Sequence, residues 1–116
     1  MSPSKTVRWG VIGLGWFGEV HADNLSEMPG IELAALCTRR PERLNEVADR
    51  LEVTRRYTDF RALLADPEID VVSITTHIND HRDIAIEALR SGKHVLLEKP
   101  MAPTVADCEK IVEAAH

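Results

Sequence analysis

Short apolar runs alternate along this chain with segments in which apolar residues recur every three or four positions. The apolar runs predict β-strands over residues 7–12, 31–37, 69–75 and 95–97. A further short strand is expected over residues 53–57. The periodic segments predict helices that begin near Trp16, Pro41, Thr58 or Asp59, His81 and Thr104. Strand and helix thus alternate, and this order favours right-handed crossovers between parallel strands.

The alternation predicts an α/β fold, a doubly wound, Rossmann-like parallel sheet with helices on both faces. We expect one domain over residues 1–116, because no linker, repeat or low-complexity segment divides the chain. Ligands of such sheets bind at the carboxyl ends of the strands. Four polar stretches are expected at that edge, namely 13–18, 38–40, 75–81 and 98–100.

The first of these stretches is a glycine-rich turn, G-L-G-W-F-G, between the first strand and the first helix. In a dinucleotide-binding turn, Gly13 permits the bend, Gly15 admits the pyrophosphate and Gly18 lets the helix pack on the sheet. The N–H groups that open the helix, from Trp16 and Phe17 onward, then face the phosphates. The turn therefore predicts dinucleotide binding. The alternative is a turn whose glycines serve packing alone.

The end of the second strand indicates which dinucleotide is bound. An NAD site places an acidic residue on the ribose 2′-hydroxyl about 20 residues after the glycines. This chain has Thr38 there, followed by Arg39 and Arg40. A hydroxyl and two guanidinium groups suit a 2′-phosphate, which a carboxylate would repel. The pattern favours NADP, with NAD possible. The alternative is that both arginines are solvated and the site is unselective.

The third polar stretch, residues 75–81, is dense in hydrogen-bonding groups and is expected to contact the nicotinamide half of the cofactor. The residues predicted to do so are Thr75, Thr76, His77 and His81. Two alternatives stay open for this stretch. A histidine before a helix can serve as a cap or be solvated, and Asp80 can be the N-cap of the helix that follows.

Composition narrows the class of protein further. The 116 residues carry a net charge of −5 and are 44% hydrophobic, as expected of a globular domain. The negative charge argues against nucleic acid or an anionic membrane as a partner, and no apolar run is long enough to span a bilayer. Cys37 and Cys108 are far apart and lack metal-ligand spacing, so we expect two reduced thiols, no metal site and a cytoplasmic protein.

The fourth stretch follows an apolar strand and reads Glu98-Lys99-Pro100. Together with G-L-G-W-F-G, the helix start at Asp59, the segment from His81 through A-x-x-A-L-x-S-G-K-H-V, and E-K-P-M-A, it resembles the Gfo/Idh/MocA family of NAD(P)-dependent oxidoreductases. The resemblance runs from residue 7 to about residue 115. It implies hydride transfer between a nicotinamide cofactor and a sugar, an inositol or a similar polyol.

The resemblance also implies roles for the fourth stretch. Lys99 would lie beside the nicotinamide and the reacting oxygen, where a cation can polarise that oxygen or assist proton transfer. Glu98 would orient the ribose, and Pro100 would fix the bend of the backbone. The chain departs from the family at Thr76-His77-Ile78, where members have Thr-Pro-Asn.

Members of the family continue into a second α/β domain that carries the substrate pocket and the face used in oligomers. This chain ends at His116, so the resemblance implies a cofactor domain that binds NADP(H) and turns over a sugar-like substrate poorly or not at all. An edge strand that the second domain would cover is then exposed, which favours homo-oligomers. Two other classes stay open: a non-catalytic module that senses nucleotides, and a structural domain that has lost its ligand.

Overall fold

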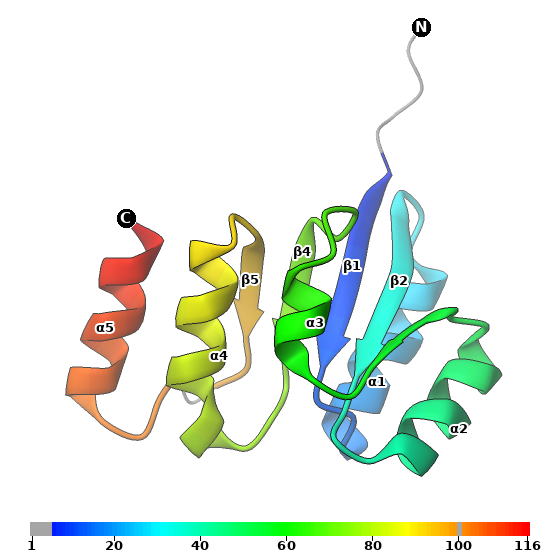
Figure 1. The fold of residues 1–116 in the computed structure, drawn as a ribbon, viewed down its shortest axis with the longest axis horizontal. Helices are drawn as coiled ribbons and strands as arrows, with labels where there is room; N and C mark the ends of the chain where they lie inside the picture. The colour runs from blue at the N-terminus through cyan, green and yellow to red at the C-terminus, as the bar shows by residue number, and fades with distance from the viewer. Residues whose placement is uncertain (1–5, 100) are drawn as a thin grey trace, which may run out of the picture.

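The computed structural model describes residues 6–99 and 101–116, and its five strands form one parallel sheet. The strands are β1 (Val7–Ile12), β2 (Ile31–Cys37), β3 (Arg55–Tyr57), β4 (Val71–Ile74) and β5 (His94–Leu97). The helices are α1 (Trp16–Glu27), α2 (Pro41–Leu51), α3 (Phe60–Leu64), α4 (Ile78–Arg90) and α5 (Val105–Ala115). The strand order β3-β2-β1-β4-β5 confirms the predicted doubly wound fold (Figure 1).

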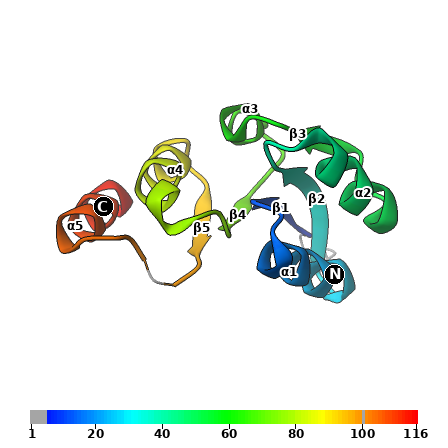
Figure 2. The same cartoon turned by 90° about the horizontal axis from the view of Figure 1, so that it is seen from below.

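Helices cover both faces of the sheet, as Figure 2 shows in the view from below. Alternate side chains of each strand point to opposite faces, so neighbouring residues of β1 enter different cores. Val11 packs with residues of α1 and α2, whereas Ile12 packs with residues of α3 and α4. The chain places β2 and β3 on one side of β1, and then β4 and β5 on the other side. The carboxyl end of β1 therefore lies between those of β2 and β4.

Several helix boundaries follow from capping residues in the sequence. Asp59 caps α3, and its carboxylate accepts a hydrogen bond from the Arg61 N–H at 2.9 Å. Thr104 caps α5 in the same way, through the Asp107 N–H at 3.1 Å. Gly92 follows α4 with a φ of +87°, a conformation that glycine adopts without strain.

Several boundaries differ from those predicted: β4 spans Val71–Ile74 instead of residues 69–75, and β5 begins at His94 instead of residue 95. Helix α4 begins at Ile78, three residues before His81, because His77 is its N-cap and accepts a hydrogen bond from the Asn79 N–H at 3.3 Å. Asp80 therefore lies in the first turn of α4 and is not its cap. Strand β3 begins at Arg55, not at Val53, because the Val53 N–H bonds to the Ala48 carbonyl oxygen and closes the end of α2.

Strand β5 lies at one edge of the sheet, and its residues alternate between half-buried and exposed. Leu96 on β5 is 45% exposed. Helix α5 lies beyond β5 and packs against α4 (Figures 1 and 2). In the part of the chain that the structure describes, no helix combines the length and the apolar character needed to cross a membrane.

Candidate functional site

The glycine-rich turn is shaped by two glycines whose hydrogen atoms face other parts of the backbone. Gly13 has a φ of +100°, and a Cβ there would lie 2.8 Å from the backbone of Thr75 and Thr76. A Cβ on Gly18 would lie 2.0 Å from the Gly13 carbonyl oxygen. Both glycines are therefore required by the fold itself, whether or not a ligand is bound.

Gly15 differs from these two glycines. Its φ of −71° suits any residue, and a Cβ built on it would meet no atom of the chain within 4 Å. Neither backbone strain nor crowding within the described chain accounts for a glycine here. The absence of a Cβ leaves open space in which a ligand could approach the backbone closely.

The start of α1, beside Gly15, is also suited to an anion. Gly15 is the N-cap of α1 and supplies no side chain to bind the free N–H groups of the first turn. Those groups and the positive end of the helix dipole favour a phosphate. The acidic residue of this turn, Glu19, is bound by Arg43 and Arg50, which lower the pKa of its carboxyl below the usual value.

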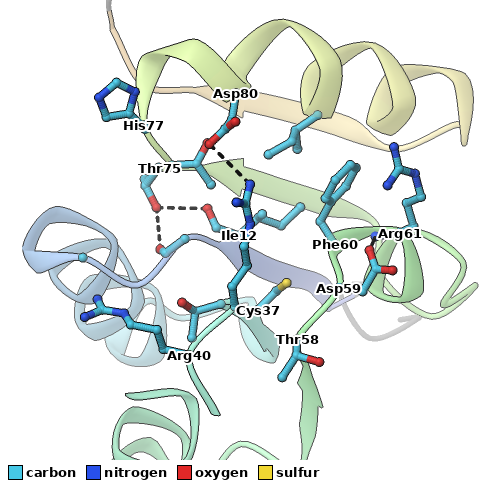
Figure 3. A pocket seen from close by; sticks show the side chains of 16 residues that line it. Ile12, Cys37, Arg40, Thr58, Asp59, Phe60, Arg61, Thr75, His77 and Asp80 are labelled. Carbon is cyan, nitrogen blue, oxygen red and sulfur yellow. Dashed lines mark hydrogen bonds and ion pairs between the residues drawn. The ribbon is translucent and has the colours of Figure 1, made fainter. Parts of the chain in front are cut away.

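Hydrogen bonds hold the ends of three strands together around this turn. The Gly13 N–H donates to the Cys37 carbonyl oxygen at 2.8 Å, which joins β1 to the end of β2. The Thr75 hydroxyl donates to the Gly13 carbonyl oxygen at 2.7 Å, which joins β1 to the end of β4 (Figure 3). Thr75 therefore fixes the turn, and its hydroxyl is already engaged within the protein.

These three strand ends surround a cleft of about 570 Å³, which is within the usual size of a small-molecule site. The predicted site residues that line it are Gly13, Gly15, Thr38, Arg39, Arg40, Thr75, Thr76 and His77. Three arginines and two aspartates are among all of its lining residues. The cleft thus has an excess of positive charge, although the net charge of the whole chain is −5.

Among the described residues, one buried side-chain polar atom has no hydrogen-bond partner, and its residue lines the cleft. The hydroxyl oxygen of Thr76 is buried and has no hydrogen-bond partner among residues 6–99 and 101–116. A buried hydroxyl usually has one, because leaving it unpaired costs roughly 1–3 kcal/mol. The spare hydroxyl of Thr76 and the open space at Gly15 both fit a dinucleotide bound along this edge of the sheet.

His81, predicted to contact the cofactor, does not line the cleft. Its side chain is 2% exposed. Nε2 lies 3.1 Å from the Thr76 carbonyl oxygen, and Nδ1 lies 3.2 Å from the Met101 carbonyl oxygen. Because it bridges the segment before α4 and the segment after β5, His81 ties together two polar stretches instead of lying exposed in one of them.

The residues that follow β5 also lie outside the cleft. The Glu98 carboxylate is 3.5 Å from Nε2 of His21 on α1, while Lys99 is exposed. Pro100 is outside the described residues. Of the fourth polar stretch, the described residues Glu98 and Lys99 do not line the three-strand cleft, although β5 ends at the same edge of the sheet (Figure 1).

The aromatic pair of the glycine-rich turn, Trp16 and Phe17, is also not among the residues that line the cleft. Trp16 is 78% exposed and Phe17 is 42% exposed. Their rings are 6.0 Å apart, and the Phe17 ring meets the His21 ring edge-on at 4.9 Å. Their backbone N–H groups, not their side chains, belong to the start of α1 that suits a phosphate.

The sequence analysis did not predict some of the residues that line the cleft. Those on the side of the cleft next to α3 and α4 are Thr58, Asp59, Phe60, Arg61, Asp80 and Ile84 (Figure 3). Four of them belong to the segment that leads from β3 into α3, which reaches the cleft because β3 pairs with β2. The sequence signal is the cap at Asp59, which by itself indicates only the start of a helix.

Both cysteines of the chain are free thiols. Cys37 lines the cleft at the end of β2, and burial raises the pKa of its thiol to about 12, with a smaller contribution from Asp59. A thiol of this pKa is protonated at neutral pH and is a poor nucleophile. Among the described residues, no group of histidine, cysteine and carboxylate side chains is suited to hold a metal ion.

Comparison with known proteins agrees with this geometry. Myo-inositol 2-dehydrogenase of Thermotoga maritima is 36% identical over 107 residues, which cover 92% of this chain and 32% of that protein. A glycosyl hydrolase family 109 protein of Shewanella baltica is 36% identical over 119 aligned positions, with 95% of this chain and 26% of that protein covered. The chain thus spans about a third or less of the length of these relatives.

Solved structures show the same likeness. Scyllo-inositol dehydrogenase from Lactobacillus casei, with bound NAD(H) and scyllo-inositol, superposes with a TM-score of 0.90 at 30% identity, over 95% of this chain and 33% of that one. The model of the Gfo/Idh/MocA oxidoreductases, described as an NAD-binding Rossmann fold, matches residues 7–116. These findings favour an oxidoreductase domain over a nucleotide-sensing module. The chain belongs to the Gfo/Idh/MocA family of oxidoreductases, and residues 7–116 match the NAD-binding Rossmann domain of that family.

Proposed function

We propose that this domain binds NADP(H), with NAD(H) as the weaker ligand, for hydride transfer to or from a polyol in an oxidoreductase. The open space at Gly15 is the observation that carries the proposal, because no atom of the described residues 6–99 and 101–116 requires a glycine there. Since the chain spans about a third of its relatives, hydride transfer requires the further residues that would hold a substrate against the nicotinamide.

The preference for NADP rests on the end of β2. Thr38, Arg39 and Arg40 line the cleft where an NAD site places a carboxylate. Within residues 6–99 and 101–116, Arg40 has no ion-pair partner, so its guanidinium is available to a 2′-phosphate. Because a related structure contains bound NAD(H), the central test is to compare the affinities of this chain for NADPH and NADH.

The proposed substrate is a sugar-like polyol such as an inositol. Two of the relatives support this class, since they are named as inositol dehydrogenases. Lys99 is the proposed catalytic residue. It is exposed two residues after β5, and a cation there would polarise the substrate oxygen or assist proton transfer. The free thiols of Cys37 and Cys108 support a reducing compartment such as the cytoplasm.

Homo-oligomers are part of the proposal. Edge strand β5, with Leu96 45% exposed, supports self-association, because an open sheet edge can pair with another chain. Light scattering over a range of concentrations tests this point, with Leu96→Lys as the variant expected to be monomeric. If wild type and Leu96→Lys have equal masses at all concentrations, β5 does not mediate self-association.

Calorimetric titration of the chain with NADPH and NADH in parallel tests the cofactor proposal. We expect both to bind, and NADPH to bind more tightly. Arg40→Ala should reduce the affinity for NADPH and leave that for NADH nearly unchanged, because only NADPH carries the 2′-phosphate. Equal affinities of the wild-type chain for NADPH and NADH would support the cofactor site but contradict the preference for NADP that is argued from the arginines. Binding of neither cofactor would contradict the proposed function.

A further inference from the structure

Arg39 and Asp80 face each other across the cleft. A terminal guanidinium nitrogen of Arg39 lies 3.5 Å from a carboxylate oxygen of Asp80, the ion pair that ends on Asp80 in Figure 3. Arg39 follows β2, whereas Asp80 lies in the first turn of α4, after β4. Because β1 lies between β2 and β4, the pair spans the carboxyl end of β1, where the glycine-rich turn begins.

The ion pair lies where the proposed cofactor would bind. Both residues line the cleft, and a dinucleotide on a doubly wound sheet crosses the carboxyl ends of these central strands. Arg39 is also one of the two cations expected to bind a 2′-phosphate. In the structure as described, however, its guanidinium is turned towards a carboxylate on the opposite side of the cleft.

The pair is exposed enough for a ligand to break it. The Arg39 side chain is 79% exposed and that of Asp80 is 39% exposed. An exposed pair of this kind changes an equilibrium by roughly fivefold or less. A phosphate, which can accept two parallel hydrogen bonds from a guanidinium, is a strong competitor for Arg39.

We propose that Asp80 sets the preference of the site between ligands with and without a 2′-phosphate, because it holds Arg39 in a pair that the phosphate must break. Asp80 is thus a positioning residue that acts through Arg39. This inference rests on the proposed function. It predicts that the wild-type chain discriminates less between NADP and NAD than its two arginines alone would allow.

The experiment uses two adenosine ligands that differ in one group. The ligand 2′,5′-ADP carries the 2′-phosphate and 5′-AMP lacks it, so the ratio of their dissociation constants isolates the contribution of that phosphate. Calorimetry on the 116-residue chain should give a preference for 2′,5′-ADP that is about three- to fivefold larger in Asp80→Asn than in wild type. Asp80→Glu, which keeps the charge, should have a preference close to that of the wild type.

Two further variants separate the pair from a general effect of charge. Asp83→Asn removes the same charge from the same helix, but Asp83 lies outside the cleft and pairs with Arg82. This variant should leave the preference for 2′,5′-ADP unchanged. In an Arg39→Ala background, Asp80→Asn should have little effect on the preference, since the residue through which Asp80 acts is absent.

The outcomes for this inference and for the proposed function are distinct. If the wild-type chain binds neither ligand and neither cofactor, the proposed function fails, and the inference fails with it. If the wild-type chain binds but Asp80→Asn has the wild-type preference, the inference alone is wrong. An equal effect of Asp80→Asn with and without Arg39 would also overturn it, because Asp80 would then act by charge alone.

Discussion

Nε of Arg43, in the first turn of α2, donates a hydrogen bond of 2.9 Å to the carbonyl oxygen of Leu14, inside the glycine-rich turn. The same guanidinium binds Glu19 on α1 and Glu46 on its own helix. One side chain therefore joins α2 to both the glycine-rich turn and the helix that follows it. Because α2 begins next to Arg40, this contact also couples the two predicted phosphate sites.

Replacing Arg43 with methionine is expected to weaken both the fold and cofactor binding. Arg43→Met keeps most of the apolar stem but removes the hydrogen bond to the turn and one of the two cations on Glu19. We expect the free energy of unfolding to fall by about 1–2 kcal/mol. The affinity for NADPH should fall as well, since Leu14 is released and Glu19 is less neutralised. Urea denaturation and calorimetry measure the two effects.

Arg50 provides the matched control for Arg43. It also binds Glu19, together with Asp23, but makes no hydrogen bond to the turn. Arg50→Met is therefore expected to lower stability with a smaller effect on the affinity for NADPH. If both variants lose affinity equally, the contact with Leu14 does not position the turn.

The same pair of arginines makes stability depend on pH through Glu19. Their hydrogen bonds lower the pKa of the Glu19 carboxyl in the folded chain below its usual value of 4.5. The resulting stabilisation is present above the unfolded pKa and is lost as the pH falls through the folded pKa. Urea denaturation should show wild type more stable than Glu19→Gln at pH 7, with the difference shrinking below about pH 4.5. A difference that is constant from pH 7 to pH 3 would contradict this account.

The sheet could be predicted because local and long-range preferences agree along most of the chain. Runs such as 31–37 are largely apolar, as strands covered on both sides require. Caps at Asp59 and Thr104 fix where helices begin. Three of the four polar strand ends line one cleft, because the order β2-β1-β4 places them side by side at the carboxyl edge of the sheet.

The rest of the site depends on contacts that sequence spacing does not encode. His81 was counted among polar residues near a helix start, but α4 begins at Ile78, and this places the ring inside the protein. Lys99 and Glu98 follow β5, one strand further from β1 than the cleft extends. Phe60 enters the cleft because β3 pairs with β2, a long-range pairing of only three residues on each strand.

The reactivity of the Cys37 thiol tests whether the end of β2 is buried in the folded chain. Since burial raises the pKa of its thiol to about 12, the folded chain holds almost no Cys37 thiolate at pH 8, and the thiolate is the form that iodoacetamide alkylates. We expect mass spectrometry to find Cys108, which is half-buried on α5, alkylated first. Cys37 should react only when urea unfolds the chain. Rapid alkylation of Cys37 in the folded chain would contradict this description of the strand end.

Substitutions at Gly15 and Gly18 distinguish a glycine that the proposed ligand requires from one that the fold requires. At Gly15 alanine meets no atom within 4 Å, whereas at Gly18 its Cβ would lie 2.0 Å from the Gly13 carbonyl oxygen. Gly15→Ala should therefore keep its free energy of unfolding within about 1 kcal/mol of wild type, while Gly18→Ala should lose about 3 kcal/mol or more.

The affinity for NADPH should depend strongly on Gly15, although the free energy of unfolding should depend on it little. The Cβ of Gly15→Ala would occupy the space that the pyrophosphate needs, so the folded variant should bind NADPH at least about tenfold more weakly, a loss of about 1.4 kcal/mol. Urea denaturation and calorimetry on the same preparations make the comparison. Wild-type affinity in Gly15→Ala would mean that the ligand does not approach the backbone at this turn, and the glycine would then have no explanation in either the fold or the site.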